Sequence, residues 1–453
     1  VLRIAGGTIS GFQRHGIDLL ASIGTVLEGN RISGGVIGAR LWTSNTPSAV
    51  VFGNADLALG RGNIVTGASF AGVQANGAVR VVGNSISGIT DPRNGTGITL
   101  ANGATADRNL VFGSAFGIAT GANSGAVTAN TVFGNTQTGI DLGGAPPNLV
   151  VSQNVVHSNA VGIGAFSASA GLTLRNNLVY GNSAAAIRFT SVPDLRIVNN
   201  TLYAASGNAL ELLDNAPRAE IRNNIVVALT GIGFVVANAS QAGFASNYNL
   251  FQTGQGGRVG QWQGGTRATL QDWRQASFGD RESLQADPLF VAPAGADGVL
   301  GFASLTQDGS DDNFHLRSAN GDAGAAVKGS NKGGTLAVVR DGATGLPVLR
   351  AGIWSLDAVT SPGLDRAEPA TPVGAEPSPN GGFANLGFDG GTAQASVSPA
   401  SYVLVTAPNG GEILQQTRNA TITWRSAGFT GTVDLAATRD GANFVTIAAG
   451  IAN

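Results

Sequence analysis

Short apolar runs separated by asparagine and glycine fill the first 250 residues of the chain. An asparagine follows each run in steps of 21 to 25 residues, and a second, apolar register keeps the same period and phase. Self-similarity at a period of about 20 to 50 residues is typical of solenoids, propellers and repeat arrays. The asparagine register comprises Asn63, Asn84, Asn109, Asn130, Asn154, Asn177, Asn200, Asn224 and Asn247, and the apolar register comprises Val73, Ile98, Ile118, Ile140, Ile163, Ile187, Leu210 and Ile232.

The repeated runs have the character of short β-strands, as in "LTL", "LRIV" and "NTLY". They are too short and have the wrong period for helices, which excludes ankyrin-like and other helical repeats. Leucine-rich repeats share the period, but their leucine pattern is absent. The sequence therefore predicts an all-β chain built as a parallel β-helix, in which about three short strands per coil pair with their equivalents in the next coil.

The coil pattern, an asparagine, an aliphatic pair, an aromatic residue, Gly-Asn and then Gly-Ile, resembles the right-handed parallel β-helix (pectate-lyase-like) family of bacterial secreted and surface proteins. Later stretches such as "NYNLF", "ADPLFV" and "NFHLRS" resemble the closing segments of such proteins. The resemblance implies a right-handed solenoid in an extracellular or cell-surface protein. It implies no single activity, because the family includes lyases, epimerases, adhesins and surface fibres.

The repeated asparagines are interpreted as a structural ladder. Equivalent turns in stacked coils lie about 4.8 Å apart, so a side-chain amide can donate to and accept from its copies above and below. Asparagine also tolerates the left-handed conformation that a sharp turn requires. The expected ladder consists of Asn84, Asn109, Asn130, Asn154, Asn177, Asn200, Asn224 and Asn247.

Four segments are expected along the chain. Residues 1–250 form regular coils, 251–364 form terminal, decorated coils, 365–400 form a Pro- and Gly-rich closing segment or linker, and 401–453 form a partial Ig-like β-sandwich. The last segment resembles the opening strands of a bacterial Ig-like surface module, with "PNGGE" followed by Trp424. The 33-residue step from Asn30 to Asn63 is longer than the others and predicts a loop at residues 41–52.

The first residues predict an open strand edge. "LRIAGGTI" superimposes on "LRIVNNTL", which places Gly7 on the asparagine register in the middle of a coil. Unpaired strand edges invite pairing. We expect this edge to be covered by other parts of the same longer chain or by a neighbouring copy in a head-to-tail filament.

Composition excludes several classes of function. The 453 residues include no cysteine, which rules out disulfides, thiolate metal sites and thiol nucleophiles in this chain. A net charge of −2 without a basic cluster argues against nucleic acid as a partner. There is no apolar run of the length that a membrane span needs.

Five rings lie three residues beyond successive ladder asparagines. If the aliphatic residue before each ring points inward, strand alternation turns the rings outward in one stripe. Such a stripe is a candidate carbohydrate-binding surface; alternatively, it is ordinary ring stacking that supports the solenoid or lies under a loop. The rings belong to Phe112, Phe133, His157, Tyr180 and Tyr203.

Charged residues that follow the apolar register form the candidate catalytic group. Asp141, Arg188 and Glu211 are expected on one outer face, with Gly164 leaving a gap between the first two. The resemblance implies lyases that abstract a proton with a basic side chain while acidic residues, often through calcium, neutralise the substrate. The alternative is an exposed Arg188/Glu211 ion pair of little energetic weight.

The loop "DGSDDNF" is the candidate metal site, because Asp308, Asp311 and Asp312 supply oxygen ligands close together. It lacks a closing glutamate at EF-hand spacing, so a solvated loop is the alternative. His15, His157 and His315 lie far apart in the repeat count, which argues against a three-histidine site. No cofactor is required by the sequence; calcium is the one candidate.

Together these patterns favour a structural or adhesive rod of a large bacterial extracellular or cell-surface protein, fibre-forming or polysaccharide-binding. The alternative is a polysaccharide lyase or epimerase that acts on uronate-containing glycans. Expected partners are the chain itself, other parts of the same longer chain, and polysaccharide.

Overall fold

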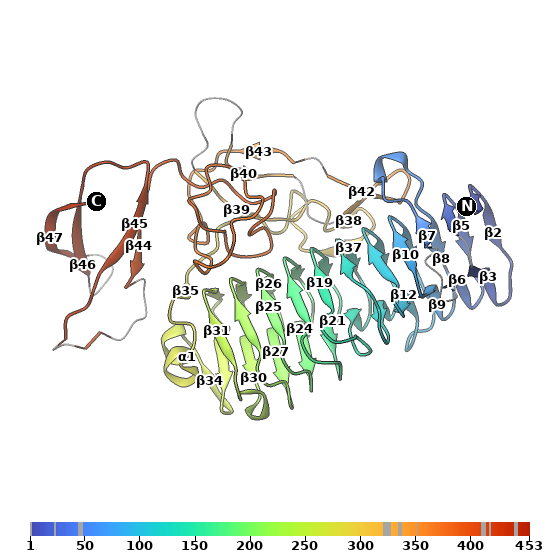
Figure 1. The fold of residues 1–453 in the computed structure, drawn as a ribbon, viewed down its shortest axis with the longest axis horizontal. Coiled ribbons are helices and arrows are strands. Elements are labelled where there is room, and N and C mark those ends of the chain that lie inside the picture. The colour runs from blue at the N-terminus through green and yellow to red at the C-terminus, as the bar shows by residue number, and fades with distance from the viewer. Residues whose placement is uncertain are drawn as a thin grey trace.

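Three long parallel sheets wind together into one solenoid (Figure 1). This computed structural model describes residues 2–21, 24–43, 49–319, 328–333, 338–350, 352–408, 414–415, 418–438 and 443–453. The sheets contain 11, 12 and 12 strands, and each coil contributes one strand to each sheet in turn, except that the last strand of the third sheet pairs antiparallel with the strand before it. The expected all-β parallel solenoid is therefore confirmed, with about 11 coils.

The strand bounds follow the repeat. Sheet A contains β1 (Leu2–Ala5), β4 (Thr25–Glu28), β7 (Val50–Gly53), β10 (Val79–Val82), β13 (Thr105–Asp107), β16 (Val127–Thr128), β19 (Val150–Ser152), β22 (Thr173–Arg175), β25 (Arg196–Val198), β28 (Glu220–Arg222) and β31 (Ala245–Asn247). Sheet B contains β2 (Thr8–Ser10), β5 (Arg31–Ser33), β8 (Ile64–Thr66), β11 (Ser85–Ser87), β14 (Leu110–Phe112), β17 (Thr131–Phe133), β20 (Val155–His157), β23 (Leu178–Tyr180), β26 (Thr201–Ala204), β29 (Ile225–Ala228), β32 (Leu250–Thr253) and β35 (Leu284–Gln285). Sheet C contains β3 (His15–Ala21), β6 (Ile37–Thr43), β9 (Ala71–Asn76), β12 (Thr96–Ala101), β15 (Phe116–Thr120), β18 (Thr138–Asp141), β21 (Val161–Ala165), β24 (Ala185–Thr190), β27 (Asn208–Leu213), β30 (Ile232–Val236), β33 (Arg258–Trp262) and β34 (Gly265–Arg267).

The apolar register stacks directly in sheet C. Ile98 pairs with Val73 on one side and with Ile118 on the other, and the series continues to Leu210. The next partner of Leu210 is Phe234 and not the expected Ile232, because strand β30 begins at Ile232, two residues later than the register suggests. These side chains are buried inside the coil together with the inward residues of the other sheets.

The buried asparagine ladder is continuous. At a typical rung, the backbone N–H and Nδ2 of Asn154 both donate to Oδ1 of Asn177, each at 3.0 Å. Nδ2 of Asn154 also donates to the carbonyl oxygen of Val127 at 3.0 Å. The ladder begins with Gly7, whose N–H donates to Oδ1 of Asn30, and it runs through every predicted rung up to Asn224.

The last rung is Asn249 and not Asn247. Oδ1 of Asn249 accepts from the N–H and Nδ2 of Asn224, at 2.9 and 3.0 Å. Asn247 lies at the end of β31, where its Oδ1 accepts from the N–H groups of Tyr248 and Glu282. The ladder residue immediately precedes a strand of sheet B, and in "NYNLF" the second asparagine holds that place.

The left-handed position in this turn belongs to the residue before the ladder asparagine in every described rung except that of Asn63. Asn199 and Asn223 have φ values of 53° and 58°, whereas their neighbours Asn200 and Asn224 carry the ladder. In each doubled asparagine the first residue therefore shapes the turn and the second joins the coils. The other turns fill the position with a variety of residues: Gly29, Gly83, Arg108, Ala129, Gln153, Asn176 and Tyr248.

A short α-helix covers the C-terminal end of the solenoid. Helix α1 (Leu270–Ser277) begins with a capping box between Thr269 and Asp272. Its Leu270 and Trp273 are buried in the solenoid core, and Nε1 of Trp273 donates to Oδ2 of Asp280 at 2.7 Å. Because α1 closes this end, the last coil does not offer an open core to the first coil of a neighbouring copy.

The coils end at Gln285, so the expected decorated coils over residues 251–364 are wrong beyond that residue. The described residues of 286–364, here called the return segment, run back along the outside of sheet B toward the N-terminal coils (Figure 1). Its described strands pair in antiparallel twos, since apolar rows on the outside of sheet B give it a surface to pack on. They are β36 (Phe290–Ala292), β37 (Phe302–Ser304), β38 (Gln307–Asp308), β39 (Asn313–Leu316), β40 (Ser330–Asn331), β41 (Val339–Arg340), β42 (Pro347–Val348) and β43 (Trp354–Ser355).

The closing segment, residues 365–400, is packed and is not a linker. Ala384, Leu386 and Phe388 are buried against sheet B. Nδ2 of Asn199 donates to the carbonyl oxygen of Asn385 at 3.1 Å. The segment therefore covers the outer side of the last coils, which agrees with the expectation of a closing segment.

The insertion between Asn30 and Asn63 differs from the predicted loop at residues 41–52. Residues 41–43 belong to β6 and residues 50–52 to β7, while residues 44–48 lie outside the described part of the chain. Extra length also comes from residues 54–62, which include the 3-10 helix η1 (Leu57–Leu59). Leu57 packs with Leu110 and with Val338 of the return segment.

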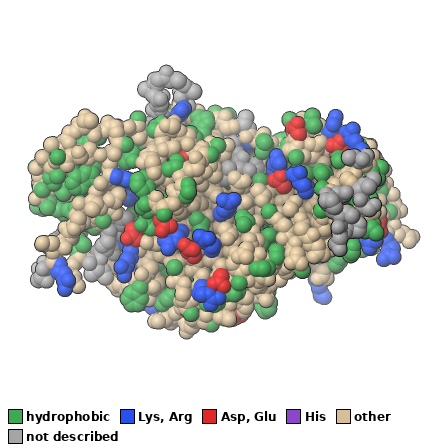
Figure 2. Space-filling view, viewed as in Figure 1, with side chains coloured by type: hydrophobic (Ala, Val, Ile, Leu, Met, Phe, Trp, Pro, Cys, Tyr) green, Lys and Arg blue, Asp and Glu red, His purple; other side chains and the backbone are tan. Residues whose placement is uncertain are grey.

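Two small antiparallel sheets follow the closing segment. One pairs β44 (Tyr402–Ala407) with β45 (Thr423–Ala427), and the other pairs β46 (Thr432–Thr438) with β47 (Phe444–Ala452). Nε1 of Trp424 donates to Oδ1 of Asn453 at 3.0 Å, which links the two sheets. Figure 2 shows exposed hydrophobic side chains at this end of the molecule. The large hydrophobic residues exposed on β47 are Phe444, Val445 and Ile447.

In the part of the chain that the structure describes, no helix has the length and apolar character to cross a membrane. The remaining helical turn is the 3-10 helix η2 (Asn238–Ser240).

Removing one amide from the ladder is expected to destabilise the solenoid. Asn177→Ala leaves the two donors of Asn154 and a carbonyl without their partner, which should lower the free energy of unfolding by about 1 to 3 kcal/mol. Chemical denaturation of the full chain measures the loss. Asn94→Ala, at an exposed turn, is the matched control and should be close to neutral. Equal stability of Asn177→Ala and the control would contradict the structural role of the ladder.

Candidate functional site

The predicted charged residues share the outer face of sheet C. Gly164 pairs with Asp141 on one side and with Arg188 on the other, and Arg188 pairs with Glu211, as expected from the repeat. Nε of Arg188 forms an ion pair with Oε2 of Glu211, and Oε1 of Glu211 accepts from Nδ2 of Asn208 at 2.6 Å. The Glu211 side chain is 8% exposed and that of Arg188 36% exposed. The guanidinium is thus engaged by its neighbour.

Asp141 is separate from this ion pair. Its Oδ1 accepts from the N–H of Gly143 at 3.0 Å, which shapes the turn after β18. Burial raises the pKa of the Asp141 carboxyl. The structure therefore brings Arg188 and Glu211 into contact and leaves Asp141 two coils away, with a role in its own turn.

The same outer row carries a second charged group at the N-terminal coils. Arg40 Nε and Nη2 donate to the two oxygens of Asp18 at 2.9 and 2.8 Å, and His15 Nδ1 lies 2.9 Å from Asp18 Oδ2. The hydrogen bond from Arg40 is the main cause of the lowered pKa of Asp18. Sequence reasoning missed this group, although "GIDL" occurs both at residues 16–19 and at residues 139–142.

Trp42 is an exposed aromatic residue beside this group. The guanidinium carbon of Arg40 lies 5.7 Å from the centre of its ring, and the side chain is 45% exposed. Exposed tryptophan next to charged and amide side chains is a common arrangement for contact with a polar ligand.

The five predicted rings form the expected outward row of sheet B, but the return segment covers it. Phe112, Phe133, His157 and Tyr180 stack with ring centroids 4.7 to 5.1 Å apart. Phe302 and Phe314 of the return segment pack on this row, and Phe133, His157 and Tyr180 are each 1% exposed. Tyr203 contacts Phe290 and Phe314. The carbohydrate-binding interpretation of the row is wrong because its central rings are inaccessible.

A small cavity of about 40 Å³ lies between the aromatic row and the return segment. It has room for about one water molecule and not for a sugar ring. His157, Tyr180 and Asp312 line it. Burial lowers the pKa of His157 to about 3 and raises that of Asp312 to about 7, so both side chains are neutral across the weakly acidic range.

The three aspartates of the candidate metal loop point to different partners. Asp311 Oδ2 accepts from the N–H of Ala296 at 2.6 Å, and Asp312 Oδ2 accepts from that of Gly301 at 2.7 Å. Asp308 Oδ1 accepts from the N–H of Ser310, two residues along the loop. Among the described residues, no three His, Cys, Asp or Glu side chains converge as a metal site requires. Calcium at this loop stays a prediction without geometric support.

The closing segment contains a buried acidic group that sequence reasoning missed. Burial raises the pKa of Asp365, Glu376 and Asp389, the last well above its ordinary value. Nε2 of His315 lies 3.6 Å from Oδ2 of Asp389, and burial lowers the pKa of His315 to about 3. Nothing in the local sequence signals this cluster, since packing of the segment against sheet B creates it.

Charge is spread over the visible surface in small mixed groups. Figure 2 shows basic and acidic side chains next to each other, without a continuous basic stripe among the described residues of that face. The arrangement agrees with the sequence in giving no support for nucleic-acid binding.

Comparison with known proteins extends these observations. The sequence matches the family described as "Right handed beta helix region" over residues 16–179 and 123–251. No curated protein matches the sequence significantly.

Solved structures with partial similarity to this chain include two epimerase modules and a pectate lyase. The A-modules of the Azotobacter vinelandii mannuronan C-5 epimerases AlgE6 and AlgE4 are 13% and 14% identical, with TM-scores of 0.41 and 0.32. The alignments cover 63% and 56% of this chain and 90% and 85% of the epimerase modules. Pectate lyase Pel9A is 12% identical with a TM-score of 0.39, covering 74% of this chain and 86% of its own.

The buried Glu376 should make stability depend on pH. Its Oε1 accepts from the N–H groups of Asn385 and Gly391, both at 2.7 Å, and burial raises its pKa from 4.5 to about 7. The folded state then keeps a proton that the unfolded state releases, so this contribution to stability is complete below pH 4.5 and is lost as pH rises through about 7.

Glu376→Gln keeps the acceptor and removes the titration. Relative to the wild type, the variant should gain about 3 kcal/mol of unfolding free energy between pH 4 and pH 8. The buried histidines titrate in the opposite sense but are common to both proteins, so they cancel in the difference. Denaturation at several pH values measures it, with the exposed Glu282→Gln as control. Parallel pH profiles for Glu376→Gln and the wild type would contradict the buried, protonated carboxyl.

Proposed function

The chain belongs to the right-handed β-helix family, and on that premise we propose that it is a rigid, non-catalytic rod of a bacterial extracellular or cell-surface protein. In this role the solenoid holds the C-terminal sheets and any attached segments at a fixed distance. Polysaccharide is the proposed partner, and no cofactor is required.

The observation that carries the proposal is the unbroken ladder. Coils stacked about 4.8 Å apart make the 11-coil solenoid about 50 Å long. Each coil is joined to the next by three strand pairings and by a buried amide, here illustrated by Asn177 and Asn200. A body connected in this way resists bending and local unfolding, which suits a spacer.

The state of the candidate catalytic residues supports a non-catalytic role. Arg188 is held by Glu211, and Asp141 is occupied by its own turn. The central rings of the aromatic row lie under the return segment. None of these groups forms a charged groove lined by long loops.

The proposal also includes a partner at the outer strand edges of the first coil. Among the described residues, no strand pairs with the outer edges of β1, β2 and β3. These edges can pair with further β-structure from the same polypeptide or from a second copy. A second copy would meet α1 at the other end of the solenoid, so we favour further segments of the same polypeptide.

The alternative function is that of a polysaccharide lyase or epimerase acting on uronate-containing glycans. The one observation in its favour is the position of Arg188 on an outer sheet face beside Glu211 and in line with Asp141.

The two functions differ in a direct assay. Incubation of the purified chain with uronate polysaccharides should give no rise in the absorbance of unsaturated products and no change in the epimer ratio by NMR. Arg188→Ala and the exposed control Arg93→Ala should behave like the wild type. A steady rise in product that Arg188→Ala abolishes and Arg93→Ala retains would overturn the rod and establish the lyase or epimerase.

A further inference from the structure

A cleft of about 330 Å³ lies between the solenoid, the closing segment and the sheet of β44 and β45, here called the hairpin. Small-molecule sites commonly have volumes of about 300 to 1,000 Å³ and often lie between structural units. The walls include Tyr248 and Glu282 from the solenoid, Arg366 and Phe383 from the closing segment, and Thr406 and Arg425 from the hairpin.

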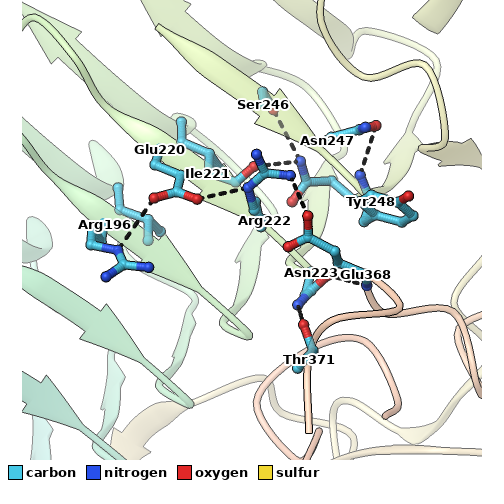
Figure 3. Close-up of polar contacts among 12 residues, drawn as sticks. Arg196, Glu220, Ile221, Arg222, Asn223, Ser246, Asn247, Tyr248, Glu368 and Thr371 are labelled. Atoms are coloured by element: carbon cyan, nitrogen blue, oxygen red, sulfur yellow. Dashed lines mark hydrogen bonds and ion pairs between the residues drawn. The ribbon is translucent and has the colours of Figure 1, made fainter. Parts of the chain in front are cut away.

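The closing segment is fixed beside Tyr248 by polar contacts with the solenoid (Figure 3). Arg222 of β28 donates through Nη1 to Oε1 of Glu368 at 3.0 Å. Asn223 donates through Nδ2 to Oγ1 of Thr371 at 2.9 Å and accepts from the N–H of Glu368 at 2.8 Å. These bonds hold one wall of the cleft against sheet A.

The hairpin wall is also attached to the closing segment. Nη1 of Arg366 donates to the carbonyl oxygen of Val405 at 3.2 Å, and the hydroxyl of Tyr402 donates to that of Gly381 at 3.1 Å. The guanidinium carbon of Arg425 lies 3.5 Å from the centre of the Phe383 ring. Both arginines therefore have defined positions at the cleft.

The two guanidiniums have no carboxylate at contact distance, although Asp365, which also lines the cleft, carries a charge that reaches both. Neither Arg366 nor Arg425 forms an ion pair with a carboxylate of the described residues, and Nε of each is buried without a hydrogen-bond partner. Burial lowers the pKa of both, and their mutual repulsion adds to this for Arg366. Asp365 acts in the opposite direction and raises the pKa of both arginines. Its own carboxyl accepts from Oγ of Ser398 at 2.6 Å, and burial raises its pKa, which favours its neutral form.

We propose that this cleft binds a carboxylated sugar, a uronate unit of a polysaccharide, through Arg366 and Arg425. Paired guanidiniums favour a planar carboxylate, with which they form strong charge-assisted hydrogen bonds. The Tyr248 ring supplies apolar surface for the C–H side of a sugar ring, while the Phe383 ring supports the Arg425 guanidinium.

The other walls distinguish a sugar acid from other anions. Glu282 and Thr406 offer oxygen atoms that accept hydrogen bonds from hydroxyl groups. The carboxylate of Glu282 would also repel a multiply charged phosphate. The inference rests on the polysaccharide-binding part of the proposed function, and it names the site and the chemical class of the ligand.

Calorimetric titration of the full chain with a trigalacturonate tests the site. The wild type should bind it, and a neutral trisaccharide should bind at least tenfold more weakly. Arg366→Gln and Arg425→Gln should each weaken trigalacturonate binding at least tenfold, whereas the exposed control Arg93→Gln should leave it unchanged. Glu282→Ala should also weaken binding while leaving the arginine contacts to the hairpin in place, which guards against a folding defect in Arg425→Gln.

The outcomes separate this site from the proposed function. Binding that is unchanged in Arg366→Gln, Arg425→Gln and Glu282→Ala would overturn the site and leave the polysaccharide-binding rod standing. Absence of binding to trigalacturonate and to neutral and acidic polysaccharides would overturn both. Competition by acetate at the same concentration as trigalacturonate would overturn recognition of the sugar.

Discussion

The structure depends on one buried amide per coil. Each ladder oxygen accepts two donors from the preceding asparagine, as Asn177 does from Asn154, and each Nδ2 donates to the next ladder oxygen. A buried amide that lost these partners would carry its full desolvation cost. Every coil must therefore repeat the same turn at the same height, and this requirement fixes the register of all three sheets.

Fixed register determines what the outer faces can do. It places equivalent positions of successive coils side by side in rows. Arg188 therefore contacts Glu211 on sheet C, and the rings of Phe133, His157 and Tyr180 stack on sheet B. A continuous apolar row in water is costly, and burying it offers the chain a second core. The return and closing segments form that core, which explains why the aromatic row is not a binding surface.

The sequence was sufficient for features that depend on the repeat alone: the solenoid, the ladder, the inward aliphatic residues and the contact of Arg188 with Glu211. It misplaced the last rung at Asn247, because two asparagines two residues apart fit the period almost equally well. The end of the coils and the path of the return segment were beyond its reach. They depend on contacts such as that of Thr131 with Val338, 207 residues apart, which have no periodic signature.

Buried polar groups without a hydrogen-bond partner lie mainly where the repeat ends. Inside the solenoid, equivalent residues satisfy one another, and a charge such as Arg188 finds its partner one coil away. The closing segment and the hairpin have no equivalent neighbours, so Asp389, Glu376, Arg366 and Arg425 keep buried polar atoms without protein partners. Burial of the carboxyls is tolerated because they can stay protonated, as their raised pKa values indicate. An arginine side chain has no such neutral form at ordinary pH, so its charge needs a nearby anion, which is Asp365 in part and, at the proposed site, a bound carboxylate.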